Sequence, residues 1–333
     1  MKVCIVGGDI DSERPSGVIR KIYAEFSVAH DVTMFNGILP KDIKGFDLIL
    51  WFPNISNEKE KDYPKKDKGA ILICSKLMHD DVSEADAVSR IFRMQGNAVV
   101  AFYKGMISSP GRILMKTIDA LGNSWGLTND IPKLVRIIID IYNWSKAQKR
   151  KSLIHCDDPI IPEIKLEQKF IDINTLIADK VQSHLGARFF GNFSTRCMKL
   201  FPCKREDEAY LFSPRNTDKK RISQDDFVLT TDTHYYGGRK PSVDAPVQIE
   251  VFKRFPNINY MIHGHATIPF APETLQYYPC GSLLEVPEIS ELFSSGLRCI
   301  NLKNHGFLIA AETLDGLEYI AKFCEFLPKD IIR

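Results

Sequence analysis

Short apolar runs alternate with longer amphipathic stretches along the first half of the chain. The runs are rich in β-branched residues, which favours strands, and they lie at 2–6, 31–35, 46–52, 69–74 and 98–103. Helical periodicity is found around them, at 15–26, 83–95, 110–121 and 131–144. Because strands and helices alternate, we expect a doubly wound, mostly parallel sheet of Rossmann or flavodoxin type over residues 1–147.

The pattern changes after residue 147. Residues 148–164 are first basic and then proline-containing, without sustained periodicity, and this composition predicts a linker. Residues 165–333 then return to helical and strand patterns, which predicts a second domain. Its densest stretch, residues 240–266, holds a turn of small polar residues, an amphipathic helix and a strand.

The strand in that stretch ends in His263-Gly264-His265. Alternate side chains of a strand lie on one face, so the two imidazoles can point at one place. Two imidazoles with the carboxylate of Asp244 upstream suit a divalent metal such as zinc. The best candidate for a third ligand is His305, in Asn304-His305-Gly306. The alternative is that His263 and His265 are two polar residues on an exposed strand face.

A second polar segment follows the strand predicted at 188–190. It contains Gly191, Asn192 and Ser194, and it combines small side chains with backbone and hydroxyl donors. Such a segment can surround a phosphate with little steric hindrance, and a β-hairpin turn is the alternative interpretation.

Composition adds limits to this picture. The chain has 333 residues and a net charge of +2, and we expect its short basic clusters at 65–66 and 149–151 to be solvated surface. Nucleic acid binding is therefore not indicated. No apolar run approaches the roughly 20 residues of a membrane span, and no secretory signal is recognisable. Eight scattered cysteines without a CxxC pair fit reduced thiols in a cytoplasmic protein.

Several short motifs occur in a recognisable order. They are GNFS at 191–194, SP at 213–214, ISQDDFV at 222–228, KPSVD at 240–244, HGH at 263–265 and NHG at 304–306. Over about residues 165–325 the chain resembles the class II aldolase/adducin family, whose members include fuculose-1-phosphate aldolase and ribulose-5-phosphate 4-epimerase.

The resemblance implies an α/β/α fold with a mostly antiparallel sheet, a homotetramer, and a zinc ion held by three histidines. The ligands would be His263, His265 and His305. It also implies aldolase or epimerase activity on a phosphorylated sugar or related polyol through an enediolate. The acid at Asp244 is closer to the epimerase form, and Asp244 would be the base or a further metal partner. The phosphate-binding residues would be Gly191, Asn192, Ser194 and Ser242.

The chain departs from the family pattern in three places. Arg215 follows Ser213-Pro214, at a position where the family has a small hydroxyl side chain. Its guanidinium could bind a phosphate or carboxylate through bidentate hydrogen bonds, or it could block the phosphate pocket. In the family, the region after the second histidine of this motif supplies an acid from a neighbouring subunit. In this chain the region after His265 is short, and Glu273 and Tyr278 are the candidate replacements. Surface and packing roles remain the alternative for both. No counterpart of the family's tail tyrosine follows His305.

Two other functions remain open. The second domain could be a non-catalytic interaction module like the adducin head domain, which keeps the fold without the metal. Alternatively, the protein could be bifunctional, with an N-terminal domain that binds a nucleotide or nucleotide-sugar.

Overall fold

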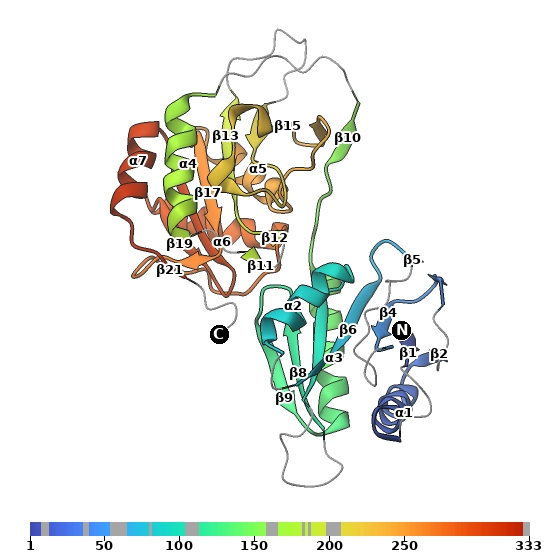
Figure 1. The fold of residues 1–333 in the computed structure, drawn as a ribbon. Coiled ribbons are helices and arrows are strands. Elements are labelled where there is room, and N and C mark those ends of the chain that lie inside the picture. Colours follow the sequence, from blue (N-terminus) through green and yellow to red (C-terminus); the bar gives the residue numbers. More distant parts are fainter. Residues whose placement is uncertain are drawn as a thin grey trace. The chain divides into compact units, whose positions relative to one another are not determined.

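The computed structural model describes residues 1–7, 13–35, 40–53, 65–79, 82–103, 113–157, 166–181, 184–185, 188–197 and 208–328. Within these ranges the chain forms two compact units, one built on Met1–Ala147 and the other on Gln148–Lys329 (Figure 1). Each unit has its own sheet and its own apolar core.

The N-terminal unit contains a seven-stranded sheet in the order β2-β1-β4-β6-β7-β8-β9. The first five of these strands are parallel to one another, which confirms the predicted mostly parallel sheet. The strands are β1 (Lys2–Val6), β2 (Asp31–Phe35), β4 (Leu48–Trp51), β6 (Ile71–Met78), β7 (Ala98–Tyr103), β8 (Leu114–Asp119) and β9 (Ser124–Thr128). The helices are α1 (Glu13–Ser27), α2 (Glu84–Arg93) and α3 (Ile131–Ala147), and a separate pair of short strands is β3 (Asp42–Ile43) and β5 (Lys65–Lys66).

One element of this unit was predicted wrongly. Residues 110–121 read as a helix, but 114–119 form β8, which pairs antiparallel with β7 and β9. The reason is a tight turn that the carboxylate of Asp119 holds together. Asp119 Oδ1 accepts hydrogen bonds from the backbone N–H groups of Leu121 (2.9 Å) and Asn123 (3.0 Å), and Oδ2 accepts one from Trp125 Nε1 (3.0 Å).

The C-terminal unit contains an eight-stranded sheet in the order β10-β16-β15-β14-β13-β17-β20-β19. All neighbours are antiparallel except β10 and β16, so the predicted mostly antiparallel sheet is confirmed. The strands are β10 (Ile154–Cys156), β13 (Asn192–Cys197), β14 (Ala209–Phe212), β15 (Val228–Thr230), β16 (His234–Tyr236), β17 (Tyr260–Gly264), β19 (Cys299–Leu302) and β20 (Gly306–Ala311).

Helices cover both faces of this second sheet (Figure 1). Ile262 on β17 packs with α4 (Gln168–Val181) and α7 (Leu314–Phe323). Its neighbour Met261 points to the opposite face and packs with α5 (Ala245–Arg254) and α6 (Val286–Ser294). The strand alternation therefore produces a three-layer α/β/α arrangement.

Short elements complete the C-terminal unit. They are β11 (His184–Leu185), β12 (Arg188–Phe189), β18 (Ala266–Thr267), β21 (Leu327–Pro328), and the 3₁₀ turns η1 (Lys219–Arg221), η2 (Gln224–Asp226) and η3 (Leu283–Glu285).

The segment predicted as a linker begins inside the C-terminal unit. Residues 154–156 form β10, the edge strand that pairs with β16, because their backbone groups find partners there. Upstream, Leu283 N–H donates to the carbonyl of Lys149 (2.7 Å), and Ser282 Oγ donates to Gln148 Oε1 (2.7 Å). The described part of the segment is thus fixed to the turn before η3, while residues 158–164 lie outside the described ranges.

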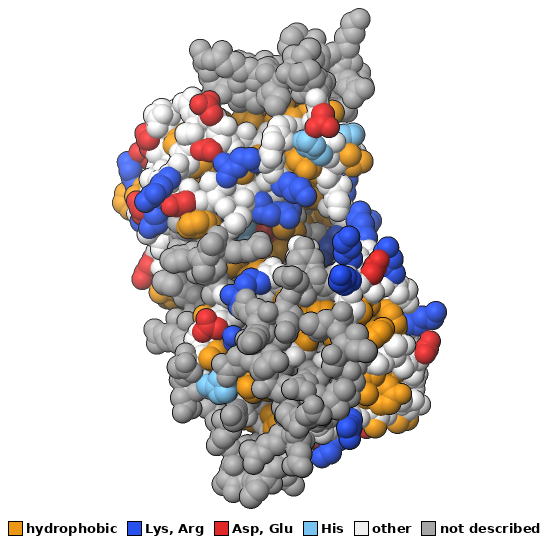
Figure 2. All heavy atoms as spheres, turned by 45° about the vertical axis from the view of Figure 1, so that its right-hand side comes forward, with side chains coloured by type: hydrophobic (Ala, Val, Ile, Leu, Met, Phe, Trp, Pro, Cys, Tyr) orange, Lys and Arg blue, Asp and Glu red, His pale blue; other side chains and the backbone are white. Residues whose placement is uncertain are grey.

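On the face that Figure 2 shows, lysine and arginine side chains are interspersed with acidic and hydrophobic ones. None of the helices in the described ranges is long and apolar enough to cross a membrane.

Candidate metal centre

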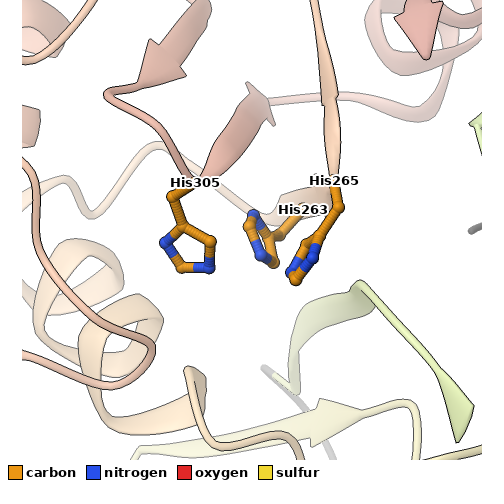
Figure 3. A group of neighbouring side chains, drawn as sticks. All are labelled: His263, His265 and His305. Carbon is orange, nitrogen blue, oxygen red and sulfur yellow. The ribbon is translucent and has the colours of Figure 1, made fainter. Parts of the chain in front are cut away.

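Two adjacent strands bring the three histidines together. His263 lies in β17, which pairs with β13 on one side and β20 on the other, and His265 follows directly. His305 is the last residue of the turn that leads into β20. Gly306 makes the close approach possible, since a Cβ at this position would lie 2.1 Å from the carbonyl oxygen of Gly264. The register of β17 and β20 therefore places all three imidazoles at one end of the strand pair (Figure 3).

The three rings are close and buried. Their centroids are 4.7 Å apart for His263 and His305, and 5.1 Å apart for each pair that includes His265. One nitrogen of each ring lies within 4.8 Å of the others, and the residues are only 2%, 5% and 1% exposed in sequence order. Such a cluster has the donor type and number that a catalytic zinc site uses.

The hydrogen bond made by Nδ1 of His263 directs the other ring nitrogen, Nε2, as a possible ligand for a cation. Its Nδ1 donates to the carbonyl oxygen of Phe307 (2.8 Å), so its Nε2 carries a lone pair. Nε2 is buried and has no hydrogen-bond partner among the described residues. Burying an unpaired nitrogen is unfavourable unless something fills its lone pair, and a divalent cation fits that need.

A chain of polar contacts leads from His263 to the start of α5. Asp244 Oδ2 is 3.8 Å from His263 Nε2, and Asp244 Oδ1 accepts from the backbone N–H of Gly281 (2.7 Å). Ser242 Oγ accepts from the Asp244 N–H (3.2 Å) and from Asn192 Nδ2 (3.1 Å). Asp244, Ser242 and Asn192 therefore form one connected group beside the histidines.

The residues predicted to bind phosphate occupy two different environments. Gly191 has a φ of +80°, and a Cβ there would lie 2.7 Å from the carbonyl oxygen of His263, so the turn needs glycine. Asn192 and Ser242 lie beside Asp244. Ser194 is fully buried, however, and its hydroxyl donates to Gln248 Oε1 of α5 (2.6 Å), so it supports the sheet–helix layer beneath the site.

A cavity of about 350 Å³ opens beside Ser242, and Arg215 lies in its wall as part of a basic lining. Arg215 Nε donates to the carbonyl oxygen of Pro241 (3.3 Å). The other cationic side chains that line it are Arg150, Lys151 and Lys240, and no carboxylate does so among the described residues. Lys151 is paired with Asp232. The basic cluster at 149–151, interpreted from sequence as solvated surface, thus contributes two side chains to this cavity.

The two predicted replacements for the family's acid do not join the histidine cluster. Tyr278 is buried, and its hydroxyl donates to Glu288 Oε1 of α6 (2.8 Å). Burial, with the nearby Glu288 carboxylate, raises the pKa of Tyr278 to about 12. Glu273 is exposed and forms an isolated bridge with Asn301.

Sequence reasoning missed two groups at the centre. Cys280 Sγ is 3.3 Å from His305 Nε2, and Asp244, Cys280 and His305 form a second cluster of donors within 4.8 Å of one another. Glu285 is buried and lines a cavity of about 10 Å³ together with Asp244, His263 and His305. Burial above all, then the charge of Asp244 and that of Glu288, raises the pKa of the Glu285 carboxyl well above its usual range.

Residues 172–275 match the family model described as Class II Aldolase and Adducin N-terminal domain. The C-terminal half of the chain contains a class II aldolase/adducin domain. The matched residues include His263, His265 and Asp244, whereas His305 and Cys280 lie beyond them. Members of the family are generally metal-dependent lyases or epimerases.

Solved structures similar to the chain have low identity and low TM-scores. An L-fuculose 1-phosphate aldolase is 18% identical, with 46% of this chain and 79% of that chain covered and a TM-score of 0.37. YgbL, a putative aldolase/epimerase/decarboxylase from Escherichia coli, is 14% identical, with 49% and 94% covered and a TM-score of 0.36. A DNA/pantothenate metabolism flavoprotein from Streptococcus pneumoniae is 12% identical, with 44% and 99% covered and a TM-score of 0.32. No curated protein matches the chain significantly in sequence.

Proposed function

We propose that the class II aldolase/adducin domain is a metal-dependent aldolase or epimerase that acts on a phosphorylated sugar or related polyol. The observation that carries this proposal is the buried cluster of three histidines in which His263 Nε2 has no hydrogen-bond partner among the described residues. A domain that only bound another protein would have no need to bury three imidazoles around one point, because that burial is unfavourable without a bound group.

His263, His265 and His305 are the residues that would hold the cation, and zinc suits their donor type. A cation bound there supplies a Lewis acid for a substrate hydroxyl and carbonyl. The Phe307 carbonyl orients the His263 ring through its Nδ1 proton, which keeps the coordinating nitrogen directed at the centre.

Asp244 is the proposed base. The backbone N–H of Gly281 and the hydroxyl of Ser242 hold its carboxylate at the edge of the centre, with one oxygen on the side of His263. A carboxylate in that position can take a proton from a substrate hydroxyl, as retro-aldol cleavage requires, or from a carbon next to a carbonyl. Both reactions pass through related anions, so Asp244 serves an aldolase or an epimerase equally.

The basic cavity is the proposed site for the anionic end of the substrate. It adjoins Ser242, which is linked to Asp244, so a sugar whose phosphate lay among Arg215, Lys240 and Arg150 would extend toward the histidines. One guanidinium group can donate two parallel hydrogen bonds to a phosphate, which orients the substrate as well as binding it.

We also propose that the domain forms a homo-oligomer in which Glu273 lies near a neighbouring subunit. Phe270 and Leu275, on the same loop, are fully and 77% exposed, which is unfavourable for apolar side chains in a monomer. We also propose a cytoplasmic location, where thiols stay reduced. No disulfide joins the cysteines of the described ranges.

The test combines metal analysis with a substrate screen. Purified protein is analysed for zinc and other divalent metals and then assayed against phosphorylated ketoses and aldoses for cleavage and for epimerisation. Bound metal with turnover of at least one sugar phosphate is the expected result. A protein that binds no divalent metal, and in which His263→Ala changes only stability, would instead be the interaction module.

A further inference from the structure

The thiol of Cys280 lies beside His305, at a site where the sequence predicted only imidazole and carboxylate ligands. We propose that Cys280 is a further ligand of the metal, so that the centre combines histidine nitrogen with a thiolate. This inference rests on the proposed metal centre and adds to it a residue from outside the stretch that matches the family. Its consequence is a preference for soft divalent metals.

The distance between Cys280 and His305 suits a shared ion. Zinc lies about 2.3 Å from a thiolate sulfur and about 2.0–2.1 Å from an imidazole nitrogen, so at a tetrahedral angle the two donors stand about 3.5 Å apart. Cys280 Sγ and His305 Nε2 are 3.3 Å apart, which needs almost no movement to accept a cation between them. A donor atom of Asp244 completes this cluster within 4.8 Å.

His263 provides independent support for a ligand at this point. Its Nε2 is buried without a hydrogen-bond partner among the described residues, and it lies 3.8 Å from Asp244 Oδ2, a member of the Cys280 cluster. The two donor clusters also share His305. The Cys280 cluster and the three-histidine cluster are therefore adjacent, and a cation held by His305 would lie beside the Cys280 thiol.

The backbone around Cys280 is built to hold the thiol in place. Gly281 has a φ of +75°, and a Cβ there would lie 2.7 Å from the carbonyl oxygen of Val243. The Gly281 N–H is bound to Asp244 Oδ1, and the Ser282 N–H donates to the carbonyl of Pro279 (3.2 Å). This turn packs against the segment that carries Asp244, so the base and the thiol are positioned together.

A thiolate ligand changes which metals the centre prefers. Thiolates are soft donors that favour zinc, whereas magnesium, calcium and manganese suit oxygen ligands. With Cys280 in the coordination sphere, the centre would take zinc or cobalt strongly over manganese or magnesium. Without it, three imidazoles and a carboxylate would discriminate less between these groups of metals.

Cobalt titration of the full-length, metal-free protein tests this inference directly. Co²⁺ is added while the absorption spectrum is recorded, because a coordinated thiolate gives an intense charge-transfer band in the near ultraviolet that imidazole and carboxylate do not. We expect this band in the wild type, its loss in Cys280→Ser and Cys280→Ala, and its retention in the control Cys156→Ser, whose thiol on β10 is in neither cluster.

The same titration separates the two proposals. Visible cobalt bands of a histidine site without the charge-transfer band would overturn the role of Cys280 and leave the metal centre intact. Absence of any saturable cobalt binding would overturn both. Zinc affinity, measured by competition with a chelator, should fall at least about 10- to 100-fold in Cys280→Ser. Loss of a residue that only hydrogen-bonds to a metal ligand already lowers affinity by this factor, and loss of a ligand should lower it at least as much. Circular dichroism verifies that each variant is folded, and absence of the charge-transfer band in the wild type overturns the role of Cys280 even if neither variant folds.

Discussion

Two sets of buried polar side chains, one in each unit, serve different purposes. In the N-terminal unit, Asp119 is buried and its carboxylate is saturated by backbone and side-chain donors of one hairpin. In the C-terminal unit, His263, His265 and His305 are buried around a common point, and Nε2 of His263 has no hydrogen-bond partner among the described residues. Burial of a polar group is tolerated when it is paired, so the first arrangement stabilises a turn and the second calls for a bound group.

The largest expected effect comes from His263→Ala. Removing one of three ligands should lower metal affinity more than about 100-fold, beyond the range seen for outer-sphere partners, and abolish turnover. Isothermal titration with zinc and the sugar-phosphate assay measure the two effects. His155→Ala, which changes an exposed histidine of the same unit, is the control and should leave both unchanged. Equal metal binding in the two variants would contradict the histidine site.

Next in size is Asp244→Asn. The amide keeps the shape of the side chain but cannot act as a base, so kcat should fall about 10²- to 10⁴-fold while the metal content stays close to that of the wild type. Steady-state kinetics and metal analysis on one preparation provide both values. Full activity of Asp244→Asn would remove Asp244 from the catalytic step.

Asp119→Ala tests the buried carboxylate of the N-terminal unit. The loss of hydrogen bonds to a charged acceptor should destabilise the N-terminal unit by about 1.5–3 kcal/mol, with no change in metal binding. Calorimetry of the full chain, with metal analysis beside it, measures this. A loss of metal in Asp119→Ala would mean that the two kinds of buried polar group are not separate in function.

A smaller effect is expected from Arg215→Ala. Loss of one charged contact to the substrate should raise KM about 10-fold for a phosphorylated sugar, with little change for the same sugar without phosphate. Arg221→Ala is a matched control, because that side chain is 88% exposed and lines no described cavity. A parallel rise in KM for both sugars would contradict the anion pocket.

The smallest effect concerns Glu285 and pH. Its folded-state pKa lies above the unfolded value near 4.3, so as pH rises through that interval the unfolded chain releases a proton that the folded chain retains. Stability therefore falls with rising pH across this window. Glutamine does not titrate, so Glu285→Gln does not lose stability in this way. In metal-free protein, the free energy of unfolding of Glu285→Gln minus that of the wild type should therefore increase from pH 4 to pH 8. Urea unfolding at several pH values measures the difference, and a constant difference would contradict the raised pKa.

Sequence patterns were sufficient where a feature depends on neighbouring residues. The parallel sheet followed from local alternation, whereas the antiparallel sheet was implied by the family resemblance. The histidines were identifiable because HxH on one strand face and Asn304-His305-Gly306 are compact motifs. Hairpin β8–β9 was missed because its turn depends on the Asp119 side chain, whose bonds are visible only after folding.

Residues placed by long-range contacts could not be predicted. Arg150 reaches the basic cavity because its backbone pairs with Ser282, far along the chain. Cys280 reaches His305 through the bond between Gly281 and Asp244, which no local pattern encodes. The misplacement of Ser194 has a similar cause, since only packing of α5 reveals that Gln248 takes its hydroxyl.

The metal content of the wild-type protein tests the histidine site most directly. After purification and exposure to zinc, followed by removal of free metal, elemental analysis should find one zinc per chain, and His263→Ala treated identically should hold almost none. A wild-type protein that retains no zinc, cobalt or other divalent metal under these conditions would show that the histidine cluster is not a metal site.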